Sequence, residues 1–124
     1  MILIDASIII EYLQTQNATL LSVMQTNQAA ICGVTRAEVL SGSRHPKHRQ
    51  RLDTLDQISL SDSFWDVVGD HVAELRSNGV TVPFPDAVLS ALSLSLDVEL
   101  WSRDQHFAHI QRVIPALKLF QEPP

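Results

Sequence analysis

Met1-Ile2-Leu3-Ile4-Asp5 opens the chain with an unbroken apolar run that ends at an acid. A short continuous apolar run is typical of a strand covered on both faces, as inside a parallel sheet. Asp5 would then lie at the carboxyl end of the strand, where open α/β sheets bind their ligands. We interpret Asp5 as one of several acids that line a common pocket. The alternative is that Asp5 only caps the helix that follows.

Length and composition predict one domain, residues 1–124, with a substantial core. The chain has 124 residues, close to the usual size of a domain, and 45% of them are hydrophobic. No apolar run approaches the roughly 18 residues of a membrane span, and the start lacks the positive segment of a signal peptide. Cys32, the single cysteine, fits a small core residue in a reducing compartment, so we expect a cytoplasmic protein.

Strand-like and helix-like patterns alternate along the chain, which predicts an α/β fold with a central, mostly parallel sheet. Beyond the first strand, we expect strands at residues 28–34, 58–60 and 98–101, with an edge strand at 117–120. We expect helices at residues 8–13, 17–25, from about 46, from 63 to 78, from 87 to 96 and from 105.

The longest predicted helix ends before Gly79, a residue suited to a helix stop. Its apolar residues recur at helical spacing, so we assign them to the core: Phe64, Val67, Val68, Val72 and Leu75. His71 in the same helix is interpreted as partly exposed.

Thr35-Arg36-Ala37-Glu38 follows the second predicted strand and has the spacing of a capping box. In that motif Glu38 reaches back to the backbone amide of Thr35, which is the favoured interpretation when the motif is taken alone. The functional alternative is that Glu38 faces the carboxyl ends of the strands.

Asp86 and Asp104 also follow apolar segments. Asp86 comes after two prolines, Pro83 and Pro85, which restrict the backbone, and we expect it to open a helix at residue 87. Because a negative side chain stabilises a helix N-terminus, a capping role for Asp86 stays open. Ser102-Arg103-Asp104 follows a predicted strand and repeats the strand-then-acid order of the first five residues.

Positive charge is concentrated in residues 44–51. The net charge of −5 argues against a nucleic-acid partner, but this segment holds four of the nine Lys and Arg residues: Arg44, Lys47, Arg49 and Arg51. We expect it to form a helix from Pro46 that is either a solvated face or a contact for RNA phosphates. His45 and His48 are interpreted as surface residues rather than metal ligands, and metal ligation by the pair His106 and His109 is the less favoured interpretation.

Four acids follow predicted strands or open predicted helices: Asp5, Glu38, Asp86 and Asp104. In a parallel α/β sheet such positions share one rim, where four carboxylates would repel one another. A hard divalent cation relieves this repulsion, and oxygen ligands favour Mg²⁺ or Mn²⁺ over zinc. Because such a metal can activate water and hold phosphodiester oxygens, the pattern predicts a hydrolytic nuclease.

The ordered motifs resemble those of PIN-domain proteins, especially the small VapC-type ribonuclease toxins. The resemblance covers essentially the whole chain, and the ordered set is far more specific than any one motif. It rests on residues 1–13 with Asp5-Ala6-Ser7, on Thr35-Arg36-Ala37-Glu38, on Pro85-Asp86-Ala87, and on Ser102-Arg103-Asp104-Gln105-His106-Phe107.

The resemblance implies a three-layer α/β/α sandwich with a mostly parallel sheet of four to five strands. It also implies a Mg²⁺- or Mn²⁺-dependent endoribonuclease toxin, a small antitoxin protein as its inhibitor, and a homodimer. By the match, Asp5, Glu38, Asp86 and Asp104 are catalytic and bind the metal. Ser7 and Ser102 are secondary polar residues. Ala6 departs from the Thr that the family often carries.

Two other functions remain open. The first is a non-catalytic RNA-binding module that uses residues 44–51 and holds a structural ion. The second is a phosphoacceptor receiver or phosphatase-like α/β domain. Ser7 stands where such phosphatases need a second Asp, and Lys118 is the only lysine late in the chain.

A protein partner is a further expectation. We expect the two amino-terminal helices and the helix after Asp86 to form an apolar groove for an amphipathic antitoxin helix. An antitoxin Arg would also be suited to reach the acids.

Overall fold

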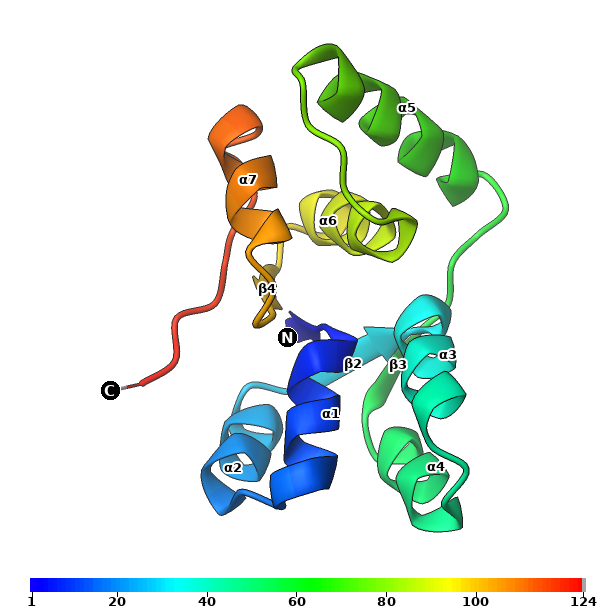
Figure 1. Ribbon diagram of the computed structural model, residues 1–124, viewed down its shortest axis with the longest axis vertical. Coiled ribbons are helices and arrows are strands. Elements are labelled where there is room, and N and C mark those ends of the chain that lie inside the picture. Colours follow the sequence, from blue (N-terminus) through cyan, green and yellow to red (C-terminus); the bar gives the residue numbers. More distant parts are fainter. Residues whose placement is uncertain (124) are drawn as a thin grey trace.

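The computed structural model describes residues 1–123 and has a four-stranded parallel sheet with helices on both faces (Figure 1). The strands lie in the order β3-β2-β1-β4 and are β1 Ile2–Ile4, β2 Ala29–Cys32, β3 Asp56–Ile58 and β4 Glu99–Trp101. The helices are α1 Ala6–Thr15, α2 Ala18–Thr26, α3 Gly33–Gly42, α4 Pro46–Asp53, α5 Phe64–Ser77, α6 Phe84–Leu96 and α7 His106–Val113. The predicted α/β class and parallel sheet are confirmed.

The central strand β1 is buried on both faces because its side chains alternate between two cores. Ile2 and Ile4 join a cluster with residues of α1 to α4, among them Ile9, Met24 and Leu52. Leu3 joins the opposite cluster, which includes Leu89, Phe107 and other residues of α5 to α7. This alternation explains why the first strand reads as a continuous apolar run.

The sheet therefore separates two helical layers. Figure 1 shows α1, α2 and α4 on one side of the sheet and α5, α6 and α7 on the other. No helix within the described residues is long and apolar enough to cross a membrane.

The strand order reverses direction at β1. The chain leaves β1 toward β2 and β3 on one side, and later returns to place β4 on the other side. The amide of Asp5 donates to the carbonyl of Trp101 over 2.9 Å, which joins the carboxyl ends of β1 and β4. A reversal of strand order at this end of a parallel sheet is where α/β folds bind ligands.

Three strands are shorter than, or shifted from, those predicted from the sequence. β2 ends at Cys32 because α3 begins at Gly33. Cys32 pairs with Ile58, so Ser59 and Leu60 have no neighbouring strand to pair with, and β3 covers 56–58 instead of 58–60. The predicted strand at 117–120 is reduced to a single bridge between Leu119 and Leu100.

Helix boundaries follow local capping chemistry. Asn17 accepts hydrogen bonds from the amides of Thr19 and Leu20 and so caps α2 as predicted. Pro46 opens α4, also as predicted. α6 begins three residues earlier than expected, at Phe84, because Pro85 is acceptable in a first turn that needs no amide donor. Asp86 is therefore the third residue of α6.

Fewer apolar side chains of helix α5 are buried than the sequence predicted. Val68, His71 and Leu75 are spaced along one face and are buried. Val67 lies off this stripe and is 44% exposed, so its predicted place in the core is wrong. The predicted exposure of His71 is also wrong, because its Nε2 lies 2.7 Å from Ser90 Oγ on α6.

Buried His71 should make stability depend on pH. Burial lowers the pKa of His71, against an opposing effect of Glu74. The unfolded chain therefore takes up this proton first, near pH 6.5, so the contribution of His71 is complete above that pH and is lost as pH falls toward the folded pKa. The free energy of unfolding of the wild type should decrease when the pH falls from 7.5 to 5. We expect this decrease to be smaller by about 1 kcal/mol in His71→Gln.

Urea unfolding at the two pH values measures this difference. His109→Gln is the matched control, because His109 is exposed on α7. Equal pH dependence in wild type and His71→Gln would contradict the prediction.

Candidate metal centre

Asp5 is 3% exposed and accepts three hydrogen bonds at one oxygen. The hydroxyls of Ser7 and Ser102 each donate to Asp5 Oδ2 over 2.8 Å, and the Ser7 amide donates over 3.4 Å. Asp5 therefore does cap α1. Within residues 1–123 no hydrogen bond uses Asp5 Oδ1, so the cap leaves that oxygen free for a ligand at the rim.

The two serines also fix the segment that carries Asp104. The amide of Asp104 donates to Ser102 Oγ over 2.9 Å, and the amide of Arg103 donates to Ser7 Oγ over 3.0 Å. The guanidinium of Arg103 bonds Glu11 of α1 over 2.8 Å and also bonds Glu122. These hydrogen bonds and ion pairs hold the loop after β4 against α1.

Glu38 lies in α3 and does not form the predicted capping box. Within residues 1–123 its Oε1 is buried and has no hydrogen-bond partner. Thr35, which lies inside α3, likewise has a buried hydroxyl without a partner in this part of the chain. The interpretation of Glu38 as a cap for Thr35 is therefore wrong, since α3 already begins at Gly33. Burial raises the pKa of Glu38, and the charges of Asp5, Asp86 and Asp104 raise it further.

Asp86 is 5% exposed in the first turn of α6, and its carboxylate turns away from the helix backbone. His106 Nδ1 lies 2.7 Å from Asp86 Oδ2 and bonds it. Burial raises the pKa of Asp86, the bond from His106 lowers it, and the charges of Asp5 and Asp104 raise it. The bond from His106 thus opposes the effects of burial and of the acidic neighbours on Asp86.

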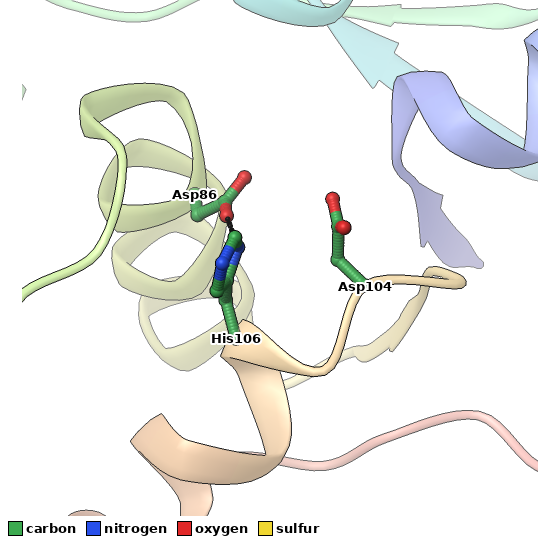
Figure 2. A group of neighbouring side chains, drawn as sticks. All are labelled: Asp86, Asp104 and His106. Atoms are coloured by element: carbon green, nitrogen blue, oxygen red, sulfur yellow. Dashed lines mark hydrogen bonds and ion pairs between the residues drawn. The ribbon is translucent and has the colours of Figure 1, made fainter.

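Side chains from separate elements gather at the carboxyl edge of the sheet. Asp5 and Glu38 lie near enough for their charges to act on Asp86, but the compact group of possible ligands within residues 1–123 includes neither of them. Asp86, Asp104 and His106 each offer a ligand atom, and these atoms lie within 4.8 Å of one another. Figure 2 shows the Asp86 and Asp104 carboxylates on either side of a common space, with His106 beside Asp86. His106 belongs to this group rather than to a pair with His109, which is exposed. The His106 side chain is itself 42% exposed, and a place among possible metal ligands was the less favoured interpretation from the sequence.

The donor set fits a hard divalent cation. Carboxylate oxygens predominate, as Mg²⁺ and Mn²⁺ require, and Glu38 contributes a buried oxygen that lacks a partner. A cation would also offset the repulsion that raises the pKa values of Glu38 and Asp86.

The basic segment, residues 44–51, covers the loop before α4 and most of that helix, and it is mostly exposed. Arg44, Lys47 and Arg49 lie at the surface, whereas Arg51 is half-buried, with its guanidinium 5.3 Å from the Tyr12 ring centre. His45 Nδ1 accepts from the Lys47 amide and caps α4, and His48 bonds Ser43, so both histidines have local structural roles.

A groove of about 420 Å³ lies between α1, α2 and α4. Its apolar lining includes Ile9, Leu21, Met24 and Leu55, and Arg51 lies among them. The expectation that the helix after Asp86 contributes to this groove is wrong, because α6 packs on the opposite face of the sheet.

Solved structures with the same fold come from several bacteria. A chain of VapBC2 from Rickettsia felis, bound to a promoter DNA fragment, has a TM-score of 0.78 and 19% identity over 97% of this chain and 98% of its own. FitAcB from Neisseria gonorrhoeae has a TM-score of 0.74 and 16% identity over 98% of both chains. A toxin-antitoxin complex from Klebsiella pneumoniae has a TM-score of 0.70 and 22% identity over 99% and 100%.

No curated protein matches the sequence significantly. The model of the PIN domain family matches residues 2–113, which include all four rim acids. The chain therefore belongs to the PIN domain family.

Proposed function

We propose that this chain is a Mg²⁺- or Mn²⁺-dependent endoribonuclease, acting as the toxin of a toxin–antitoxin pair. PIN domains are generally nucleases. The observation that carries the proposal is the group of Asp86, Asp104 and His106, whose ligand atoms lie within 4.8 Å of one another, with Asp5 and Glu38 near enough for their charges to act on Asp86.

In this proposal the four acids hold the cation. When bound, the cation supplies a lower pKa for attacking water and offsets the charge on phosphodiester oxygens. Ser7 and Ser102 hold Asp5 through Oδ2, which leaves Oδ1 available to a cation. The same two hydroxyls accept hydrogen bonds from the loop that carries Asp104, and so they fix the position of Asp104 relative to Asp5.

The acidic rim also requires a separate contact for RNA, because uncompensated carboxylates repel phosphates. Lys47 and Arg49 are exposed on α4, and Arg44 is exposed in the loop that joins α4 to α3, the helix that carries Glu38. We assign the phosphate contacts to this face, with Arg51 held by Tyr12 as a weaker candidate.

The antitoxin is the proposed protein partner. The structural neighbours include complexes of toxin and antitoxin, and the groove between α1, α2 and α4 is apolar enough to accept one face of an amphipathic helix. We propose a cytoplasmic homodimer in which each chain is a single domain. Failure of any small partner to copurify from the native locus would contradict the antitoxin assignment.

Cleavage of a cellular RNA pool, with and without Mg²⁺, tests the proposed activity. We expect new 5′ ends at defined sites only when the metal is present, and loss of cleavage in Asp86→Asn. Asp97→Asn is the matched control, because Asp97 is an exposed acid at the other end of α6. RNA binding without metal-dependent cleavage, over several RNAs, would instead favour a non-catalytic RNA-binding module.

A further inference from the structure

We propose that His106 is a positioning residue of the metal centre, which holds Asp86 in the orientation that presents its free oxygen to the cation. The inference rests on the proposed function and adds a residue that contacts Asp86 rather than the RNA. Asp86 and Asp5 differ in the number of hydrogen bonds that hold their side chains.

Asp5 is fixed by two hydroxyls and one amide, whereas Asp86 has a single partner. Within residues 1–123, the hydrogen bond from His106 Nδ1 to Asp86 Oδ2, 2.7 Å long, is the only one made by the Asp86 side chain. The Asp86 side chain is 7% exposed, so water cannot easily replace that partner. Removal of the imidazole would leave a buried carboxylate without a fixed orientation.

The bond also joins two elements of the site. Asp86 belongs to α6, whereas His106 opens α7 two residues after Asp104. One imidazole therefore ties Asp86 to the segment that carries Asp104, and the ligand atoms of all three residues lie within 4.8 Å (Figure 2).

The hydrogen bond to Asp86 requires His106 to carry a hydrogen on Nδ1. A carboxylate can only accept, so Nδ1 carries the hydrogen and donates to Oδ2. That hydrogen bond occupies Oδ2 and leaves Asp86 Oδ1 for the cation. Groups that orient metal-binding carboxylates in this way typically change metal affinity 10- to 100-fold when removed.

The position of Nδ1 allows a matched pair of substitutions. The amide nitrogen of Asn lies as many bonds from Cβ as Nδ1 of His, whereas the amide nitrogen of Gln corresponds to Nε2. His106→Asn can therefore restore the donor to Asp86, and His106→Gln places its donor one atom too far along the side chain.

Titration calorimetry of the full chain with Mn²⁺ tests the proposal, with RNA cleavage measured in parallel. We expect His106→Ala to weaken Mn²⁺ binding by about 10- to 100-fold. His106→Asn should recover most of the loss, and His106→Gln should not. His109→Ala, an exposed histidine on the same helix, should bind Mn²⁺ like the wild type. Unfolding curves without metal verify that the variants are folded.

The outcomes separate this proposal from the proposed function. If the wild type binds Mn²⁺ and cleaves RNA but His106→Ala binds as tightly, the positioning role is overturned and the nuclease remains. Equal Mn²⁺ affinity of the Asn and Gln variants would also overturn it. A wild type that binds no Mn²⁺ would overturn the proposed function, and the role of His106 with it.

Discussion

Asp5→Asn should reduce RNA cleavage by at least about 100-fold while the chain stays folded. The substitution removes one charge from the rim and replaces one ligand oxygen with an amide nitrogen, which cannot bind a cation. A loss of two or three kcal/mol in transition-state stabilisation is about 100-fold in rate, and metal sites supply several kcal/mol.

The fold should survive because Asn retains what Asp5 does for the backbone. Its amide oxygen can still accept from Ser7 and Ser102, and Asn caps helices as well as Asp does. Initial rates on a defined RNA, with circular dichroism of both proteins, measure the two effects. Unchanged cleavage by folded Asp5→Asn would refute the role assigned to Asp5.

Glu38→Gln should make the metal-free protein more stable and remove most of its stabilisation by Mn²⁺. Burial and three neighbouring acids raise the pKa of Glu38. A carboxyl whose folded pKa lies above its unfolded pKa loses stability as pH rises from near 4.5 through the folded pKa. At pH 7, which lies above the unfolded pKa, the environment of Glu38 therefore destabilises the folded state, and the neutral Gln relieves this by about 1 kcal/mol after allowance for solvent screening.

A bound cation should stabilise the wild type more than it stabilises Glu38→Gln. A cation at 100 times its dissociation constant stabilises the wild type by about 2.7 kcal/mol, and loss of one ligand charge reduces that gain. Thermal unfolding at pH 7, in chelator and in Mn²⁺, measures both states. Glu99→Gln is the control, because Glu99 is an exposed acid on β4. A Glu38→Gln protein that is less stable in chelator, with a normal Mn²⁺ shift, would argue against a shared site.

Local patterns were sufficient to predict most of the fold. The apolar run of residues 2–4, the Asn17 cap and the Pro46 helix start depend on near neighbours in the sequence, and the structure confirms them. The shift of β3 could not be read locally, because it depends on β2 ending where α3 begins. The layer occupied by α6 is likewise a long-range property, and for this reason the groove was predicted with the wrong helix.

The site was only partly predictable for the same reason. The order of strand and acid predicted that four acids would share one rim. The structure groups Asp86 and Asp104 with His106, and it places Asp5 and Glu38 where their charges act on Asp86. Whether they bind a cation stays a prediction. The contact between His106 and Asp86 was missed because twenty positions separate the two residues and no local signal joins them. His71 is different, since its helical spacing from Val68 and Leu75 already indicates a buried position.

Anomalous diffraction from crystals grown with Mn²⁺ tests the metal centre most directly. We expect one strong Mn²⁺ peak bounded by carboxylate oxygens of Asp5, Glu38, Asp86 and Asp104. A structure with no peak among these acids at saturating Mn²⁺, or with a peak elsewhere such as beside His45 and His48, would contradict the assignment.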